Sequence, residues 1–260
     1  MSSPATSRSA GCGETFERVT PLLAIADCLS RELAGLRFRP PVAFVYNPLD
    51  YARAAYAAYV ERFATSPKEA IFVGMNPGPF GMAQTVVPFG EVASVRDWLG
   101  IWAAIGKPAL EHPKRPVTGF DCHRAEVSGQ RLWGWARRRF GTPDAFFERF
   151  FVANYCPLLF LEASGRNLPL DKLVRDEQQA IAVHCDEALR ETVRLLAPRC
   201  VLGIGRFAER RAALALAGMG VDIGFIPHPS PASPAANRGW EGQAEAAIAA
   251  CGVELKAPVL

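Results

Sequence analysis

Three polar side chains, each at or close behind the end of a strand-like apolar run, could act together on one ligand. They are Asn76, Asn154 and His228. A side-chain amide offers both a donor and an acceptor, so Asn154 could read the edge of a pyrimidine. Prolines on both sides of His228 restrain its backbone, which favours a firmly held imidazole. If the strands are parallel neighbours, the three side chains meet at one edge and form a candidate site.

A rigid loop surrounds Asn76. The segment 74–90 combines glycines, which let the backbone approach a ligand closely, with prolines, which fix its shape. Such a loop at the carboxyl end of a strand in an α/β protein is a typical place for a ligand. Phe80 and Phe89 in this loop are either core residues or a stacking platform for a planar ligand.

Each of these residues also has a purely structural interpretation. Asn76 could bond its own backbone in a turn, and Asn154 could cap one. A single histidine such as His228 is more often structural than catalytic. The basic run Arg137–Arg139 is more typical of a solvated helix face than of a phosphate contact.

Residues 203–208 match a permissive G-x-G-x-x-A dinucleotide pattern. The matching strand is not the first of the sheet, and no acidic residue follows at the required distance. A tight strand-to-helix turn is the better interpretation, and a nucleotide-cofactor enzyme remains the less favoured alternative.

Composition restricts the class of protein. The 260 residues carry a net charge of +3, which permits nucleic-acid binding without demonstrating it. The seven cysteines include no C-x-x-C, which argues against a disulfide framework or a zinc or iron–sulfur site of short spacing. Isolated cysteines are typically small buried hydrophobes. No apolar run reaches the ~18 residues of a membrane span.

The chain reads as one domain, 14–260, behind a polar tail, 1–13, that lacks the apolar centre of a secretory signal. We therefore expect an intracellular protein, in the cytoplasm or nucleoid of a bacterium or the nucleus of a eukaryote.

Strands alternate with helices along this domain, which predicts a three-layer α/β/α sandwich around a mainly parallel four-stranded sheet. The expected strands are 71–74, 150–154, 200–204 and 221–226, with an irregular segment over 105–129. The expected helices are 14–36, 51–63 with Asp50 available as N-cap, 92–102, 130–140, 143–148, 170–196, 207–217 and 240–250.

Several motifs together resemble the single-strand-selective monofunctional uracil-DNA glycosylases, a family of the uracil-DNA glycosylase superfamily. They are GMNPGPFGMAQT at 74–85, PFGEV at 88–92, NYCPLLF at 154–160, HPSP at 228–231 and N-x-GW at 237–240. The resemblance extends in register from Tyr46 to Trp240. It implies the same sandwich fold.

The resemblance also implies an activity. Members of this family remove uracil, and oxidised pyrimidines such as 5-hydroxymethyluracil, from single- and double-stranded DNA, and they leave an abasic site. It implies no metal or organic cofactor. DNA is the expected partner of a chain that we expect to be a monomer without membrane association. A non-catalytic protein that binds single-stranded DNA or damaged bases remains the alternative.

The resemblance assigns roles position by position. Asn76 matches the amide that positions water, and His228 the histidine that stabilises negative charge on the departing base. Asn154 matches the amide that reads the uracil edge, and Phe89 the ring that stacks on the flipped base. The pocket wall near uracil C5 is matched by Gly78 and Met82, and the DNA-facing segment by Ser230, Pro231, Ala232, Ser233, Pro234, Asn237 and Arg238.

Two positions depart from the family pattern. Val86 stands where the family usually has glycine, which puts the width of the pocket in question. Ala232 stands where vertebrate-type members carry a basic wedge that fills the hole left by a flipped base. Alanine cannot fill that hole, and Arg238 could supply a phosphate contact instead.

Overall fold

A four-stranded parallel sheet lies at the centre of the molecule. The computed structural model describes residues 20–255. The sheet has the order β3-β2-β5-β6 and consists of β2 (Ala70–Gly74), β3 (Phe150–Asn154), β5 (Cys200–Ile204) and β6 (Asp222–Ile226). The sequence predicts these strands to within one residue at each end. Their nearly continuous apolar sequence is typical of strands that are covered on both faces.

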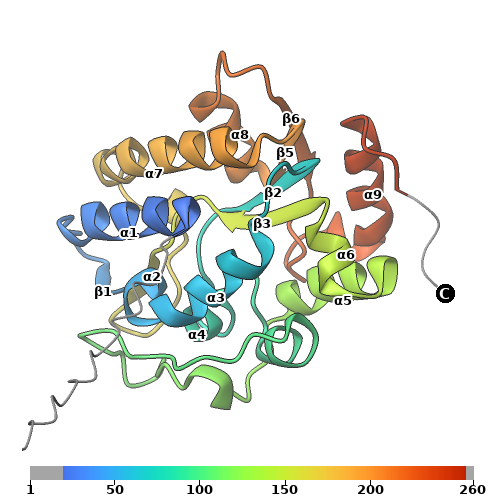
Figure 1. The fold of residues 1–260 in the computed structure, drawn as a ribbon. Helices are drawn as coiled ribbons and strands as arrows, with labels where there is room; N and C mark the ends of the chain where they lie inside the picture. Colours follow the sequence, from blue (N-terminus) through green and yellow to red (C-terminus); the bar gives the residue numbers. More distant parts are fainter. Residues whose placement is uncertain (1–19, 256–260) are drawn as a thin grey trace, which may run out of the picture.

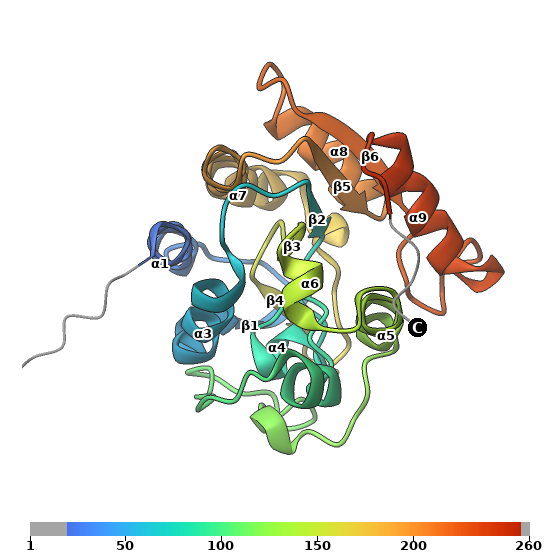
Figure 2. The same ribbon diagram turned by 45° about the vertical axis from the view of Figure 1, so that its right-hand side comes forward.

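Helices cover both faces of this sheet, so the predicted three-layer sandwich is confirmed (Figures 1 and 2). One layer contains α7 (Arg175–Leu196) and α8 (Arg206–Ala215), with α1 (Pro21–Ala34) beside α7. The other contains α5 (Val127–Phe140), α6 (Pro143–Phe147) and α9 (Trp240–Ala250). The remaining helical elements are α2 (Pro48–Tyr51), α3 (Arg53–Phe63), α4 (Met82–Thr85), η1 (Ser94–Leu99), η2 (Gly119–Asp121), η3 (Leu170–Lys172) and η4 (Ala236–Arg238).

A second, two-stranded antiparallel sheet is absent from the sequence prediction. It pairs β1 (Val42–Tyr46) with β4 (Leu159–Glu162). Each strand is short and lies next to prolines, so the apolar sequence of neither strand can be distinguished from that of a loop. Because β4 belongs to the segment that follows Asn154, this sheet helps to fix the chain that leaves the site.

Several predicted helix limits are wrong. The expected helix 51–63 is divided into α2 and α3, and Asp50 lies inside α2 without acting as a cap. The expected helix 170–196 begins as the separate 3₁₀ turn η3. The expected helix 92–102 begins at residue 92 but ends at Leu99, and its residues 94–99 form the π-helix η1. The segment 105–129, predicted as irregular, contains η2 and the first residues of α5. The polar tail 1–13 and the start of the expected helix 14–36 lie outside the described residues.

Aromatic side chains fill the space between β2, β3 and the layer of α5 and α6. Phe72 and Phe150 pack edge to face with ring centroids 5.5 Å apart, and Trp135 meets Phe146 in the same way at 6.1 Å. Tyr59 of α3 is fully buried and donates to the carbonyl of Val152 at 2.8 Å. This rigid packing fixes the sheet from which the site loops emerge.

The cysteines behave differently from the sequence expectation. A disulfide joins Cys200 of β5 to Cys251, which follows α9, across 51 residues of sequence. No short spacing could have indicated this pair. Cys156 and Cys185 are buried, as expected, whereas Cys28 is exposed.

Candidate active site

Asn76, Asn154 and His228 line one cavity of ≈ 410 Å³ at the carboxyl edge of the central sheet. Asn76 follows β2, Asn154 ends β3 and His228 follows β6. The prediction that these three side chains converge is therefore confirmed. Phe89 and Gly78 line the same cavity, and Ser230 does so from the loop after His228.

β6 is not a neighbour of β2 or β3, because β5 lies between them. His228 nevertheless lines the cavity, because it lies on the loop that continues beyond the end of β6. A Cβ atom on Gly205 would lie 3.6 Å from the Cβ of His228, and Gly205 has a φ of +90°. The Gly205 N–H also donates to the carbonyl of Ile226 at 2.8 Å, which ties this turn to the end of β6.

The same geometry settles the glycine pattern at 203–208. A Cβ on Gly203 would collide with the backbone nitrogen of Glu209, so α8 itself fills the turn. Residues 203–208 therefore form the expected tight turn between β5 and α8.

The imidazole of His228 is held in one tautomer. The backbone N–H of Ser230 donates to Nδ1 at 3.2 Å, so Nδ1 is the acceptor and the ring proton sits on Nε2. Burial lowers the pKa of His228 to about 4, which keeps the ring neutral at physiological pH. The site thus holds a neutral N–H donor.

The carboxamide of Asn76 is oriented by the chain that follows β3. Its Nδ2 donates to the carbonyl of Leu158 at 3.0 Å. The Oδ1 atom makes no hydrogen bond within residues 20–255, so an acceptor remains for a water molecule or a ligand. An amide cannot take up a proton as a carboxylate would.

Asn154 and Phe89 lie together because residue 74 is glycine. A Cβ on Gly74 would lie 2.7 Å from Cε2 of Phe89 and would collide with Oδ1 of Asn154. The Phe89 ring also lies beside the imidazole of His228, with centroids 5.8 Å apart and planes inclined by 46°. An aromatic face and a side-chain amide therefore line one cavity.

Phe89 adopts a left-handed backbone conformation, with a φ of 55°. The surrounding structure stabilises this conformation. Trp133 Nε1 donates to the Phe89 carbonyl at 3.0 Å, and a Cβ on Gly129 would collide with that carbonyl. Backbone strain of this kind costs roughly 1–3 kcal/mol and often accompanies a functional position.

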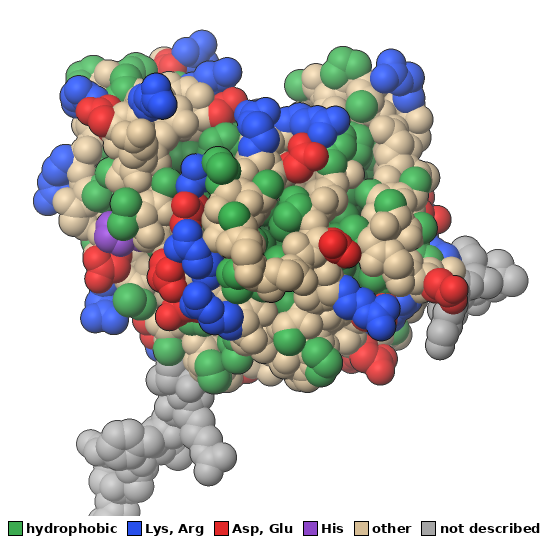
Figure 3. Space-filling view, turned by 90° about the horizontal axis from the view of Figure 1, so that it is seen from above, with side chains coloured by type: hydrophobic (Ala, Val, Ile, Leu, Met, Phe, Trp, Pro, Cys, Tyr) green, Lys and Arg blue, Asp and Glu red, His purple; other side chains and the backbone are tan. Residues whose placement is uncertain are grey.

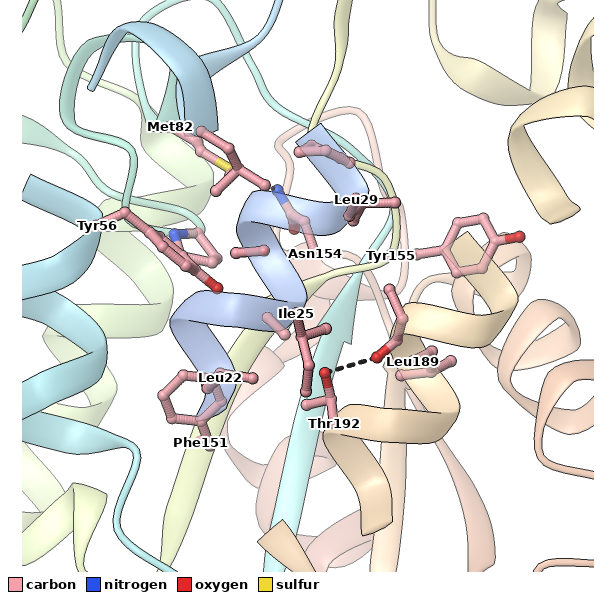
Figure 4. Close-up of a pocket in the computed structure, with 16 residues that line it drawn as sticks. Leu22, Ile25, Leu29, Tyr56, Met82, Phe151, Asn154, Tyr155, Leu189 and Thr192 are labelled. Atoms are coloured by element: carbon pink, nitrogen blue, oxygen red, sulfur yellow. Dashed lines mark hydrogen bonds between the residues drawn. The ribbon is translucent and has the colours of Figure 1, made fainter. Parts of the chain in front are cut away.

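Met82 does not lie in the cavity where the sequence places it. Its side chain lies behind Asn154, in a separate apolar cavity of ≈ 60 Å³ between α1, α7 and the sheet (Figure 4). There Asn154 Nδ2 donates to the Met82 sulfur at 3.1 Å. Met82 thus contacts the Asn154 carboxamide from outside the cavity, whereas Gly78 lines the cavity as expected.

The loop 229–238 contributes Ser230 to the cavity, while Pro231, Ala232, Pro234, Asn237 and Arg238 are exposed and Ser233 is partly exposed. Most of its polar groups are engaged locally. Asn237 donates to the carbonyl of Pro231 at 2.8 Å. Arg131 of α5 donates to the carbonyl of Pro229 and to Asn237 Oδ1 at 3.1 and 2.9 Å.

Sequence reasoning missed other residues that line the cavity: Met75, Pro77, Pro79, Glu126, Ser128, Asn167 and Pro169. Glu126 is the most informative of them. Burial, followed by the nearby charge of Glu91, raises the pKa of its carboxyl to about 7. The Asn167 Oδ1 atom is buried and has no partner among the described residues.

Other residues discussed from sequence lie outside the cavity. Phe80 packs under the guanidinium of Arg124, 4.2 Å from the ring centroid, and is not the stacking platform. Arg137 and Arg138 are exposed, as expected of a solvated helix face, and Arg138 pairs with Glu241. Arg139 departs from that interpretation, because its side chain is only 11% exposed and pairs with Glu245 of α9. On the face seen in Figure 3, basic and acidic side chains alternate rather than form one basic patch.

Val86 does not narrow the cavity. It is fully buried and packs in a cluster with Ala26, Leu49 and Ala55, against α1, α2 and α3. Its φ is 62°, a conformation that suits glycine far better than a β-branched residue. Within the described part of the chain, no group of three potential metal ligands lies together, and no helix is long and apolar enough to cross a membrane.

Comparison with known proteins gives consistent matches. The family model of the uracil DNA glycosylase superfamily matches residues 63–249. A single-strand selective monofunctional uracil-DNA glycosylase of Rattus norvegicus is 54% identical over 216 residues, which are 82% of this chain and 77% of that protein. A protein of the same name from Bos taurus is 50% identical over 219 residues, 84% of this chain and 80% of that one.

A solved structure shares the fold. The crystal structure of wild-type SMUG2 from Pedobacter heparinus matches with a TM-score of 0.63 at 18% identity, over 88% of this chain and 98% of that chain.

Proposed function

This chain belongs to the uracil DNA glycosylase superfamily, and within it to the family of single-strand selective monofunctional uracil-DNA glycosylases. From that premise we propose that it hydrolyses the N-glycosidic bond of uracil in DNA and leaves an abasic site. The observation that carries the proposal is the single cavity lined by Asn76, Phe89, Asn154 and His228. We include 5-hydroxymethyluracil and related oxidised pyrimidines, in single- and double-stranded DNA, among the proposed substrates.

His228 stabilises the leaving group. As the glycosidic bond breaks, positive charge develops on the sugar and negative charge on the base. The neutral Nε2–H of His228, whose tautomer the Ser230 N–H sets, donates to uracil O2 as this charge develops. Removing one positioned donor to an oxyanion typically costs ~10²–10³ in rate.

Asn76 positions the attacking water. Because its Nδ2 is committed to the Leu158 carbonyl at 3.0 Å, its Oδ1 accepts from the water. The water attacks C1′ of the sugar as the base leaves as an anion, and the proton that the water releases passes through solvent to the departed base. Since Asn76 cannot take the proton, the rate depends on positioning and electrostatics, and we expect it to be slower than with a carboxylate at this position.

Asn154 and Phe89 recognise the base. Asn154 Oδ1 accepts from uracil N3–H, and its Nδ2 exchanges the weak Met82 sulfur acceptor for uracil O4. Phe89 stacks on one face of the ring. The base must first leave the DNA stack, which costs a few kcal/mol and less in a single strand. With Ala232 exposed in the DNA-facing loop and unable to fill the vacated space, single-stranded substrate is preferred.

The test is excision from an oligonucleotide with one uracil, followed by alkali to cleave abasic sites. The wild-type protein should give a strand break, and His228→Ala should slow it ~10²–10³-fold. Asn76→Ala should lose most of the wild-type activity, while its melting temperature stays near that of the wild-type protein. A wild-type protein that binds the DNA but releases no uracil would contradict the proposal.

A further inference from the structure

Glu126 is the only acidic residue among those that line the cavity. Its carboxyl makes no hydrogen bond and no ion pair with any residue in the described range 20–255. A partly buried carboxyl without a partner is unfavourable, unless a ligand supplies one. The mechanism above gives this group no task.

Two glycines of the loop 74–90 make room for this carboxyl. Its Oε1 lies 3.6 Å from the position that a Cβ on Gly78 would take. A Cβ on Gly81 would lie 2.9 Å from Cδ of Glu126 and would collide with Oε2. A larger residue at position 81 would therefore displace the carboxyl from its place.

The other walls of the cavity identify the part of the base that Glu126 faces. In the proposed complex, His228 meets O2, Asn154 meets N3–H and O4, and Phe89 covers one ring face. The C5 edge of the base then faces the rest of the cavity lining, to which Gly78 and Glu126 contribute.

We propose that Glu126 is a specificity-determining residue that reads the substituent at C5 of the flipped pyrimidine. A 5-hydroxymethyl group carries a hydroxyl that can donate to the carboxylate or accept from the carboxylic acid. A 5-methyl group can do neither, and it would bury the carboxyl without a partner. The unpaired carboxyl should lower the excision of thymine about tenfold or more. This inference rests on the proposed glycosylase function.

The protonation state of Glu126 distinguishes two kinds of substituent. Burial and Glu91 raise the pKa of the carboxyl to about 7, so both forms are present near neutral pH. His228, the other titratable residue lining the cavity, stays neutral because its pKa is lowered to about 4. A 5-formyl group is only an acceptor, so it needs the acid form. The hydroxyl of a 5-hydroxymethyl group suits both forms.

The experiment compares single-turnover excision of uracil, 5-hydroxymethyluracil, 5-formyluracil and thymine from one single-stranded oligonucleotide, between pH 5.5 and 8.5. For wild type, the ratio of 5-formyluracil to 5-hydroxymethyluracil rates should fall about tenfold as pH rises through roughly 7. Rate ratios remove any effect of pH that the two substrates share, and the same ratio in Glu126→Gln shows any pH dependence that comes from the substrates themselves.

Three variants complete the test. Glu126→Gln keeps a donor and an acceptor, so the ratio should no longer change with pH. Glu126→Leu should lower 5-hydroxymethyluracil excision about tenfold relative to uracil and raise thymine relative to uracil. Glu91→Gln removes the nearby negative charge, so the pH midpoint of the ratio should move down. Glu91 does not line the cavity, so this variant changes the charge near Glu126 without changing a group that lines the cavity.

Unchanged ratios in Glu126→Gln and Glu126→Leu, or an equal loss on every substrate, would overturn the inference in favour of a purely structural or proton-accepting role. Failure of wild type to release uracil would instead contradict the proposed function. The two failures are therefore distinguishable.

Discussion

Two loops at the carboxyl edge of the sheet meet the same cavity but are built differently. The first is the loop 74–90 together with the next two residues, and every residue from 81 to 92 is buried. Gln84 alone makes four hydrogen bonds, to Pro79 and to the segment 116–119. In the loop 229–238, half of the residues are exposed. Its hydrogen bonds are largely local, apart from those that Arg131 of α5 donates to it.

Under the proposed function, this difference separates the residues that act on the base from those that face DNA. Residues that hold a water molecule and a base need fixed positions, because small displacements cost large factors in rate. A surface that faces a flexible polymer tolerates substitution, as surface loops generally do. We therefore expect substitutions in the first loop to reduce cleavage on every substrate, and substitutions in the second to alter the preference between strand forms.

The largest effect should come from Gly74→Ala. The added Cβ would lie 2.7 Å from the Phe89 ring and would collide with the Asn154 carboxamide, so both must move. Excision of uracil should fall ~10²–10³-fold, comparable to the loss of a catalytic donor. The measurement is single-turnover excision on single-stranded and duplex DNA, with equal losses expected on both.

Gly242→Ala is the matched control for this prediction, since a Cβ there meets no atom within 4 Å. It should keep wild-type excision. If Gly74→Ala also kept it, the close approach of Asn154 and Phe89 would have no role in the reaction.

An intermediate effect should follow from Ala232→Arg in the exposed loop. A long cationic side chain at this exposed position could fill the space left by the flipped base and contact phosphate. Duplex excision should rise roughly five- to tenfold, about 1 kcal/mol, with little change on single strands. Ala232→Gln separates filling from charge. An equal gain on both strand forms, lost at high salt, would indicate general attraction to DNA instead.

The same contrast explains what could be predicted from sequence. β3, β5 and α9 have the limits that their apolar patterns predict, and Asn76, Asn154 and His228 were placed at one edge by counting strand ends. These features depend on local periodicity and on a general rule for parallel sheets.

Features that depend on contacts between distant segments could not be predicted. Glu126 stands before α5 in a stretch without periodicity, and only the folded chain brings it against Gly78 and Gly81. The Cys200–Cys251 disulfide and the place of Met82 behind Asn154 are of the same kind. Periodicity describes one element at a time, whereas each of these features joins two.

The smallest effect concerns backbone strain in the first loop. Val86 and Val87 are both fully buried, but only Val86 has a positive φ, 62°. Changing either valine to glycine removes a buried side chain and raises the conformational entropy of the unfolded chain. Together these two effects should lower the free energy of unfolding by about 3 kcal/mol. Val86→Gly should recover ~1–2 kcal/mol of that cost, because glycine adopts the left-handed conformation without a steric penalty. Urea unfolding should therefore show Val86→Gly to be the more stable variant by about that difference. Equal losses in free energy of unfolding would mean that the loop carries no strain at Val86, and that its rigidity comes from packing alone.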